Sequence, residues 1–198
     1  MAIDPPLNPA RTAVLCMDMQ AAIVAIYTAG QEQQFITRSA DVLRWVREYK
    51  MTVIHIQVGF RPGLPEVNPR NALFGLIKNS PERRKLFEGE AGRIHPALGP
   101  AESDIVITKH RISAFTGTDL EMVLRAKEID TLVIFGIATS GVVLSTLLDA
   151  VDADYRVVVV GDCCADQDAD VHKVLVEKFF PRRGTVVTST DLLESLRG

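Results

Sequence analysis

Six short runs of apolar, mostly β-branched residues recur along the chain, and longer segments with helical spacing separate them. The runs occupy residues 13–18, 52–57, 105–108, 131–135, 156–160 and 184–188. They are apolar throughout instead of alternating with polar residues, which is the pattern of strands that are covered on both faces. We therefore predict six buried strands.

Four of the intervening segments repeat their apolar positions every three or four residues, which predicts amphipathic helices. The last of the four has an acidic residue suited to capping its start, Asp168 or Asp170, and we expect it to end at Pro181 because proline cannot continue a helix. The positions that mark the helices are Ile36, Ala40, Leu43 and Val46 or Arg47; Leu120, Val123, Leu124 and Lys127; Val143, Leu147, Ala150 and Val151; and Val171, Val174, Leu175 and Phe179.

Repeated alternation of strand and helix with short connections is typical of a parallel sheet with helices on both faces. The sequence therefore predicts an α/β fold of three layers, α/β/α, around a Rossmann-like parallel sheet of six strands. A chain of 198 residues is the size of one domain, so we expect a single domain over 1–198. One connection, about 59–103, is rich in Gly and Pro and is long enough to be a lid, a binding loop or an oligomer contact.

Composition and charge narrow the class of protein. Hydrophobic residues make up 47% of the chain and charged residues 24%, which is the balance of a globular protein and not of a disordered one. The 22 basic and 25 acidic residues give a formal charge of −3. The basic residues between Lys78 and Arg93 are interleaved with glutamates, which is typical of a solvated surface. A nucleic-acid partner would require a basic face, so we predict none.

Location follows from the cysteines and the apolar runs. Residues 1–9 have neither the basic segment nor the apolar segment of a secretory signal, and no apolar run approaches the roughly 18 residues that a membrane span needs. Three cysteines fit a reduced interior better than a disulfide framework. The adjacent Cys163 and Cys164 are either a strained redox couple or two small buried residues, and the second interpretation is the simpler. We expect a cytoplasmic protein with no membrane partner.

Polar residues stand at the ends of the predicted strands, where open parallel sheets bind their ligands. Asp18 ends the first strand, Gln57 ends the second and Lys109 follows the third. Taken singly, an Asp at a strand end caps a turn and a Lys is a surface charge. Together at one edge of a sheet, an acid and an amine predict a ligand site.

The fourth predicted strand leads into a glycine-containing turn at 136–142. Gly136 and Gly141 permit a tight backbone, and Thr139 or Ser140 can cap the helix that follows. The first N–H groups of that helix have no partner within it, so we expect them to form an anion or oxyanion site at the same edge. The simpler alternative is an ordinary capped helix.

Segments spread over nearly the whole chain share a more specific pattern, at residues 12–20, 57–63, 94–98, 108–120, 136–141 and 155–162. In their order and their placement at strand ends they resemble the isochorismatase-like, or cysteine hydrolase, superfamily. The resemblance implies a small-molecule hydrolase with a catalytic Asp, Lys and Cys. Asp18 and Lys109 match the first two, and Val142 stands at the position of the cysteine. The resemblance also implies a cis peptide between Ala138 and Thr139.

Valine has no lone pair or proton to offer, so the thioester route of many relatives is closed at this position. A substitute nucleophile is one alternative, supplied by one of four residues that packing or capping explains equally well: Ser140, Ser145, Thr146 or Cys164. A second alternative is a lapsed member of the superfamily that binds a metabolite or partner protein without turnover. Asp18 and Lys109 would then be a structural ion pair.

The interpretation that we favour follows relatives that hydrolyse the vinyl ether of isochorismate without the cysteine. By resemblance, Asp18 protonates the enol-ether carbon and water captures the oxocarbenium ion, while Lys109 and Gln57 position the substrate. This chemistry needs a protonated Asp18. Burial would raise the pKa of that carboxyl and Lys109 would lower it, and the sequence leaves the balance open.

Further substrate contacts are predicted around the same edge. Arg61 is either a carboxylate-binding fork or a solvated side chain, and Phe60 and Phe115 are either pocket walls or core residues. The resemblance adds the backbone of the turn, at Ala138, Thr139, Ser140 and Gly141.

We predict no metal and no cofactor. Zinc-binding relatives carry an Asp-x-His cluster after the second strand, where this chain has Gln57-Val-Gly-Phe60, and the four histidines lie in different elements. No phosphate-binding glycine loop is present in the sequence. We expect the protein to form homo-oligomers, as similar proteins commonly do.

Overall fold

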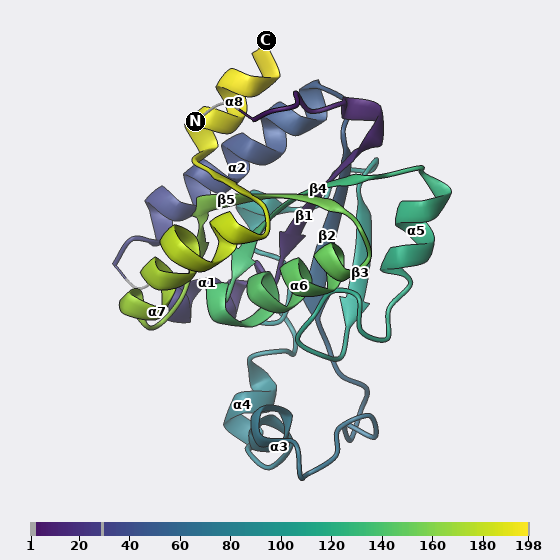
Figure 1. Cartoon of the computed structure of the whole chain (residues 1–198). Helices are drawn as coiled ribbons and strands as arrows, with labels where there is room; N and C mark the ends of the chain where they lie inside the picture. Colours follow the sequence, from purple (N-terminus) through teal and green to yellow (C-terminus); the bar gives the residue numbers. More distant parts are fainter. Residues whose placement is uncertain (1–2, 29, 198) are drawn as a thin grey trace.

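The core of the structure is one parallel sheet of six strands (Figure 1). The computed structural model describes residues 3–28 and 30–197. Outside it lie residues 1–2, 29 and 198 of the expected single domain, and residues 1–2 also belong to the start in which we expected no secretory signal. The strands are β1 (Thr12–Met17), β2 (Thr52–Val58), β3 (Ile105–Lys109), β4 (Thr131–Ile137), β5 (Arg156–Ala165) and β6 (Thr185–Val187). The predicted α/β class and the six-stranded parallel sheet are confirmed.

The strand order places the chain reversal beside β1. In the order β3-β2-β1-β4-β5-β6, the chain moves outward from β1 to β3 and then crosses to β4 on the other side of β1. All residues of β1 and β4 are buried, as their continuous apolar runs predict. Adjacent strands that feed connections on opposite sides leave a crevice at their carboxyl ends, so β1 and β4 define the expected place for a ligand.

Helices cover both faces of the sheet. They are α1 (Ala21–Tyr27), α2 (Glu32–Glu48), α3 (Ala72–Lys78), α4 (Pro81–Lys85), α5 (Leu120–Ala126), α6 (Leu144–Asp152), α7 (Ala169–Val174) and α8 (Ser189–Arg197). The four helices expected from periodicity correspond to α2, α5, α6 and α7. α2 and α8 pack together on one face, and α6 lies on the other (Figure 1). No described helix has the combined length and apolarity that crossing a membrane requires.

Two of the predicted helices contain wider, π-helical turns. Thr139–Val143 forms such a turn before α6, and Leu175–Phe179 forms one after α7. Of the two candidate caps for α7, the structure uses Asp168, whose side chain accepts hydrogen bonds from the N–H groups of Asp170 and Val171 at 3.0 Å each. The segment ends in a 3₁₀ turn, Phe180–Arg182, that contains the expected proline.

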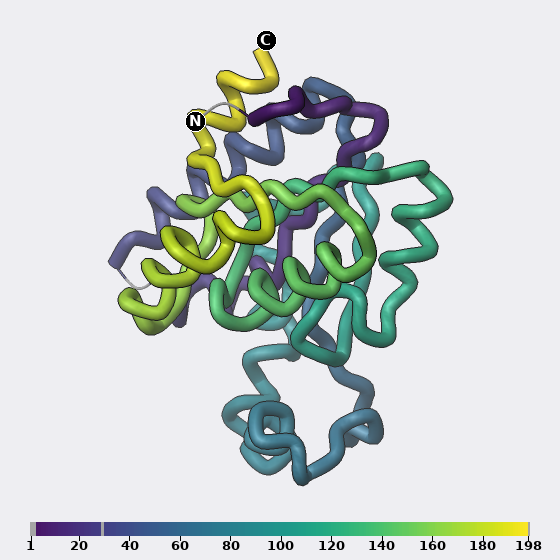
Figure 2. Tube along the Cα trace, viewed as in Figure 1, coloured from purple at the N-terminus to yellow at the C-terminus, as the bar shows by residue number. Residues whose placement is uncertain are grey.

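The long connection between β2 and β3 projects beyond the carboxyl ends of the strands (Figures 1 and 2). It contains α3 and α4 and has a small apolar cluster of its own, made by Leu64, Val67, Phe74 and Ile77. The side chain of Gln20 fastens its base, because it donates to the carbonyls of Val58 and Gly92 and accepts from the N–H of Val58. We call residues 59–103 the excursion.

Gly136 marks the closest approach of β1 and β4. Its φ is +145°, and a Cβ atom placed there would lie 2.0 Å from the carbonyl oxygen of Met17. No side chain fits at that distance, so only glycine lets the two strands pair at the point where both reach the ligand edge.

We expect Gly136→Ala to lower the free energy of unfolding by at least about 3 kcal/mol, because the new methyl group meets fixed backbone. Gly117→Ala is the matched control. Gly117 also has a positive φ, +72°, but open space around it, so only backbone strain of about 1–2 kcal/mol should appear. Urea unfolding of both variants makes the comparison, and equal losses would contradict the steric explanation.

Candidate active site

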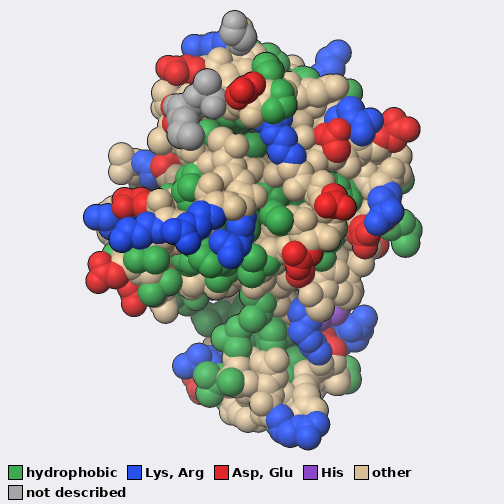
Figure 3. Space-filling model, viewed as in Figure 1, with side chains coloured by type: hydrophobic (Ala, Val, Ile, Leu, Met, Phe, Trp, Pro, Cys, Tyr) green, Lys and Arg blue, Asp and Glu red, His purple; other side chains and the backbone are tan. Residues whose placement is uncertain are grey.

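A cavity of about 530 Å³ lies between the carboxyl ends of the central strands and the excursion. Strand ends contribute Asp18, Lys109 and Ile137, and the excursion contributes Phe74 and Phe87. In the space-filling view, hydrophobic side chains gather in the recess between the body of the molecule and the excursion (Figure 3). The cavity is therefore at the edge that the strand-end rule singles out.

Asp18 and Lys109 form a buried pair in this cavity. Lys109 Nζ lies 2.8 Å from Asp18 Oδ2 and also donates to the carbonyl of Arg111 at 3.0 Å. The exposed fractions of the residues are 7% for Asp18 and 2% for Lys109. Asp18 has a φ of 53°, in the left-handed region, and its N–H donates to the carbonyl of Ile56 at 2.8 Å. A non-glycine residue held in that region is typical of functional sites.

Burial decides the protonation of Asp18. Loss of water around the carboxyl raises its pKa, and the charge and hydrogen bond of Lys109 lower the pKa by less, so the net direction is upward. Within the described residues, Asp18 Oδ1 is buried and accepts no hydrogen bond. The balance that the sequence left open therefore favours a carboxyl that keeps its proton to higher pH than an ordinary aspartic acid.

Val142, which the resemblance placed at the cysteine position, lies in the same cavity as Asp18 and Lys109. Val142 is buried, at 2% exposure, and lines the cavity together with Asp18 and Lys109. Ala138 and Gly141 line it as well. At Val142 the cavity therefore has a branched alkyl group that can shape the site but cannot form a bond to a substrate.

The turn before α6 differs from expectation in two details. The cis peptide joins Ile137 and Ala138, not Ala138 and Thr139, so the predicted position was wrong by one residue. The N–H of Ser140, expected to be free, donates to Asp166 Oδ2 at 2.7 Å. The expectation that all the first N–H groups are open to an anion was wrong, because a carboxylate from the segment after β5 already occupies one.

Two further predicted contacts in the turn lie away from the cavity wall. Thr139 is fully buried, and its hydroxyl is 2.8 Å from His172 Nδ1. The side chain of Ser140 is exposed. The structure thus brings the cavity-facing side of the turn to Asp18 and directs Thr139 and Ser140 to the segment that follows β5.

Gln57 and Phe115 are also placed elsewhere. Gln57 donates to the Thr108 hydroxyl at 3.0 Å, while its neighbour Val58 lines the cavity, because successive strand residues point to opposite sides. The ring of Phe115 lies 6.0 Å from that of Tyr155 and packs against the core. Of the two interpretations of Phe115, the structure favours a core residue.

Phe60 and Arg61 line a separate hollow of about 330 Å³ in the excursion. The Phe60 ring makes edge contacts with Phe74 at 6.0 Å and Phe87 at 5.3 Å, so it supports the rings that do reach the main cavity. Arg61 is exposed, and its guanidinium lies 3.8 Å from Glu66. Neither residue is placed on the wall that carries Asp18.

No candidate substitute nucleophile faces the cavity. Cys164 lines a second cavity on the other side of the turn, and its thiol donates to the carbonyl of Val160 at 3.4 Å. Burial raises the pKa of that thiol to about 12, which leaves almost no thiolate at neutral pH. The Thr146 hydroxyl is fully buried and accepts from the N–H of Ala114 at 3.0 Å. Ser145 is half-buried and is not part of the wall.

Several wall residues escaped the sequence analysis. α1 contributes Ile23, Ile26 and Tyr27, whose helical spacing directly after Asp18 was the available signal. Arg111 was detectable as the residue two positions beyond Lys109, on the same side of an extended chain. Its guanidinium donates to the carbonyls of His110 at 2.6 Å and Glu66 at 2.7 Å and lies 5.8 Å from the centre of the Phe74 ring.

Within residues 3–28 and 30–197, no group of three or more His, Cys, Asp or Glu side chains is arranged to hold a metal ion. The charged groups around the cavity are instead Asp18, Lys109 and Arg111, with Glu82 and Arg83 at its exposed margin. This arrangement can donate a proton and bind an anion.

Comparison with known proteins agrees with the geometry. The profile of the isochorismatase domain matches residues 12–191. The chain belongs to the isochorismatase family. Among similar solved structures, an isochorismatase family protein from Burkholderia thailandensis superposes with a TM-score of 0.85 at 31% identity, covering 98% of this chain and 99% of that one.

Curated members of the isochorismatase family are similar over most of this chain. The phenazine biosynthesis protein PhzD1 of Pseudomonas aeruginosa is 30% identical over 196 residues, covering 95% of this chain and 87% of the relative. The maleamate amidohydrolase of Pseudomonas putida is 28% identical over 164 residues, covering 82% of this chain and 74% of the relative. The chain is a hydrolase of this family, which acts on small metabolites.

The raised pKa of Asp18 should make stability depend on pH in a definite direction. The folded protein holds the Asp18 proton more tightly than the unfolded chain, so this stabilisation is complete below about pH 4 and is lost as the pH rises through the folded pKa. The free energy of unfolding of the wild type, relative to Asp18→Asn, should therefore fall between pH 4 and pH 7. Urea unfolding at successive pH values measures it. A difference that rises with pH would mean a structural ion pair with a lowered pKa.

Proposed function

We propose that this protein hydrolyses a small carboxylated vinyl ether by acid catalysis at Asp18, without a covalent enzyme intermediate. The observation that carries the proposal is a buried carboxyl of raised pKa, with one oxygen that accepts no hydrogen bond, in a cavity whose third family position is Val142. Asp18 can donate a proton, and none of the four substitute nucleophiles considered lines the described wall of the cavity. Among the hydrolytic routes of the family, protonation of the substrate suits these two observations best.

The Asp18 carboxyl gives its proton to the terminal carbon of the enol ether, and the C=C electron pair forms the new C–H bond. The adjacent carbon becomes an oxocarbenium ion, and a water molecule adds to it. The water loses a proton to the Asp18 carboxylate, and the hemiketal collapses to a keto acid and an alcohol. The acid is thereby restored in each cycle.

Lys109 supports this route through charge. After Asp18 has given up its proton, the carboxylate lies 2.8 Å from the ammonium group, so the charge that develops on the acid is stabilised where it forms. Burial and Lys109 act on the pKa of Asp18 in opposite directions: burial raises it, which favours the protonated acid, and Lys109 lowers it, which favours departure of the proton.

Arg111 and the aromatic wall define the substrate class. The guanidinium is held by two backbone carbonyls and faces the cavity, where a carboxylate would meet a fixed fork of N–H donors. Phe74, Phe87 and Ile23 provide the apolar part of the wall, which suits a ring or an alkene. A small carboxylate with an unsaturated ring satisfies both.

Two other outcomes remain open to experiment. Amide hydrolysis is represented among the relatives by a maleamate amidohydrolase, and by the thioester route it would need a cysteine, which is not among the described residues that line this cavity. A lapsed member would bind a ligand without changing it. The products of the reaction separate these outcomes.

We expect purified protein to release pyruvate from isochorismate and no ammonia from small amides such as maleamate. Asp18→Asn should lower kcat by about 10²–10⁴-fold, the usual contribution of a general acid, while the protein stays folded. Coupled assays for pyruvate and ammonia, with circular dichroism as the control for folding, test this. Ammonia release would contradict the proposal, and so would folded protein that is silent on every vinyl ether offered.

Arg111 and Arg61 are two candidates for the substrate carboxylate, and steady-state kinetics distinguishes them. Arg111→Gln should raise KM by about 10–100-fold with little change in kcat, which corresponds to one lost charged hydrogen bond. Arg61→Gln, in the separate hollow, should change KM less than twofold. The reverse ranking would restore the assignment made from the sequence.

A further inference from the structure

We infer that Asp166 and His172 are positioning residues, which hold the Thr139–Val143 turn so that its opposite side meets the substrate in a fixed geometry. The inference rests on the proposed function of the same cavity. It concerns the second layer of residues, behind the wall that carries Gly141 and Val142, and neither Asp166 nor His172 lines the Asp18 cavity.

Two consecutive residues of the turn are fastened from behind. Asp166 Oδ2 accepts from the N–H of Ser140 at 2.7 Å, and His172 Nδ1 lies 2.8 Å from the hydroxyl of Thr139. Asp166 follows β5 directly, and His172 lies in α7, so one segment supplies both contacts. We call Asp166 and His172 the clamp.

The turn needs support of this kind because its backbone is not an ordinary helix start. The carbonyl of Ala138 accepts from the N–H of Val143, five residues further along, at 3.2 Å, which is the wide pattern of a π-turn, and also from the N–H of Gly141 at 3.1 Å. Such turns occur mainly at functional sites and persist where their surroundings fix them. Thr139 is wholly buried, so loss of its partner would leave an unpaired hydroxyl in the interior.

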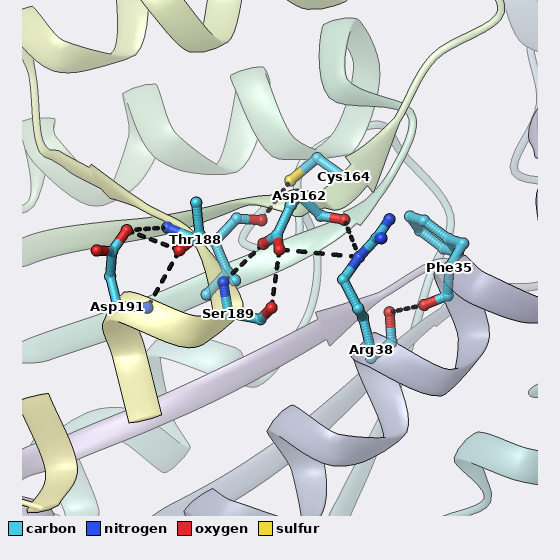
Figure 4. Close-up of polar contacts among 9 residues, drawn as sticks. Phe35, Arg38, Asp162, Cys164, Thr188, Ser189 and Asp191 are labelled. Atoms are coloured by element: carbon cyan, nitrogen blue, oxygen red, sulfur yellow. Dashed lines mark hydrogen bonds and ion pairs between the residues drawn. The ribbon is translucent and has the colours of Figure 1, made fainter. Parts of the chain in front are cut away.

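The clamp stands on a fixed base. Asp162, near the end of β5, accepts from the N–H of Ser189 at 2.7 Å and from its hydroxyl at 2.8 Å, which joins β5 to the start of α8 (Figure 4). From α2, Arg38 Nε donates to the carbonyl of Asp162 at 3.1 Å (Figure 4). The end of β5, which precedes Asp166, is therefore hydrogen-bonded to α2 and α8. These bonds restrain the position from which Asp166 contacts the turn.

Charge gives the clamp a second effect. Asp166 places a carboxylate at the first N–H groups of the turn, where the partial positive charge of a helix start is concentrated. That carboxylate offsets part of the field that the turn would otherwise direct at an anion in the cavity. His172 stays neutral near pH 7, since burial lowers its pKa against the opposing charge of Asp166.

A cysteine introduced into the turn can report the effect of the clamp on the turn, and it needs no substrate. Val142→Cys introduces a thiol that faces Asp18 and Lys109 across the cavity and has Asp166 behind it. Its alkylation by iodoacetamide reports the field and geometry of the turn. Cys16, Cys163 and Cys164 are buried, so the parent protein gives a low background rate.

In the Val142→Cys background we expect Asp166→Asn to speed alkylation at pH 7 about threefold, because removal of the carboxylate favours the thiolate while the amide oxygen still accepts from Ser140. Asp170→Asn removes the same charge from an exposed position on α7 and should change the rate less than 1.3-fold, taken as about the scatter of such surface effects. Equal alkylation rates in Val142→Cys alone and in the two double variants that add Asp166→Asn or Asp170→Asn would overturn the role of Asp166.

His172 is tested by a double-mutant cycle on turnover. His172→Leu and Thr139→Val each remove the same hydrogen bond, so each should lower kcat about 10-fold with KM within twofold, and the double variant should be no slower than the slower single variant. His172→Asn, which keeps a polar atom near the Nδ1 position, should recover most of kcat. Additive losses, or equal changes in kcat and KM, would overturn the role of His172. If His172→Leu does not fold, Thr139→Val with His172→Asn completes the comparison.

The two measurements separate this inference from the proposed function. If Asp166→Asn changes the alkylation rate as expected in a protein that hydrolyses no vinyl ether, the proposed function is wrong and the role of Asp166 remains. If the protein hydrolyses a vinyl ether but its alkylation rate does not respond to Asp166→Asn, the role of Asp166 is wrong and the proposed function remains.

Discussion

The contact between Lys109 and Asp18, 2.8 Å long and almost closed to solvent, sets the chemistry of the cavity. It joins the ends of β3 and β1 across the intervening β2, on the edge of the sheet where Gly136 also lets β1 and β4 pair closely. A buried pair of this kind contributes little net stability, because desolvation of both groups offsets their attraction. Its importance lies in the pKa of Asp18, which burial raises and the neighbouring cation lowers.

Val142 limits the chemistry that is open to Asp18 and Lys109. In a triad, a thiolate would use the acid and the amine to attack an acyl carbon. Under the proposed function, Asp18 and Lys109 face an apolar wall at this position, and the acid itself is the reactive group. The contact between Asp18 and Lys109 involves no atom of Val142, so the electrostatic part of the site does not depend on a thiol at position 142.

Much of this arrangement could be predicted from the sequence, because it depends on short-range patterns. The apolar runs gave the strands, and the strand-end rule placed Asp18 and Lys109 at one edge before any side chain was seen. What escaped prediction depends on contacts between distant segments. Gln57 was predicted to contact the substrate, but its neighbour Val58 lines the cavity, because a shift of one residue along a strand reverses the side on which a side chain points. The tie from Asp166 to Ser140 spans 26 residues and has no local signal.

The excursion has a small apolar cluster of its own, and yet it forms a wall of the cavity opposite the strand ends. Part of the apolar wall therefore comes from a segment that carries neither Asp18, nor Lys109, nor the turn before α6. Substitutions at positions such as Leu73 or Leu86 can remodel the wall while the sheet, the proton donor and the turn stay as they are. A lineage built on this plan can exchange one metabolite for another by drift in a single surface segment, and a protein engineer can treat that segment as a replaceable cassette.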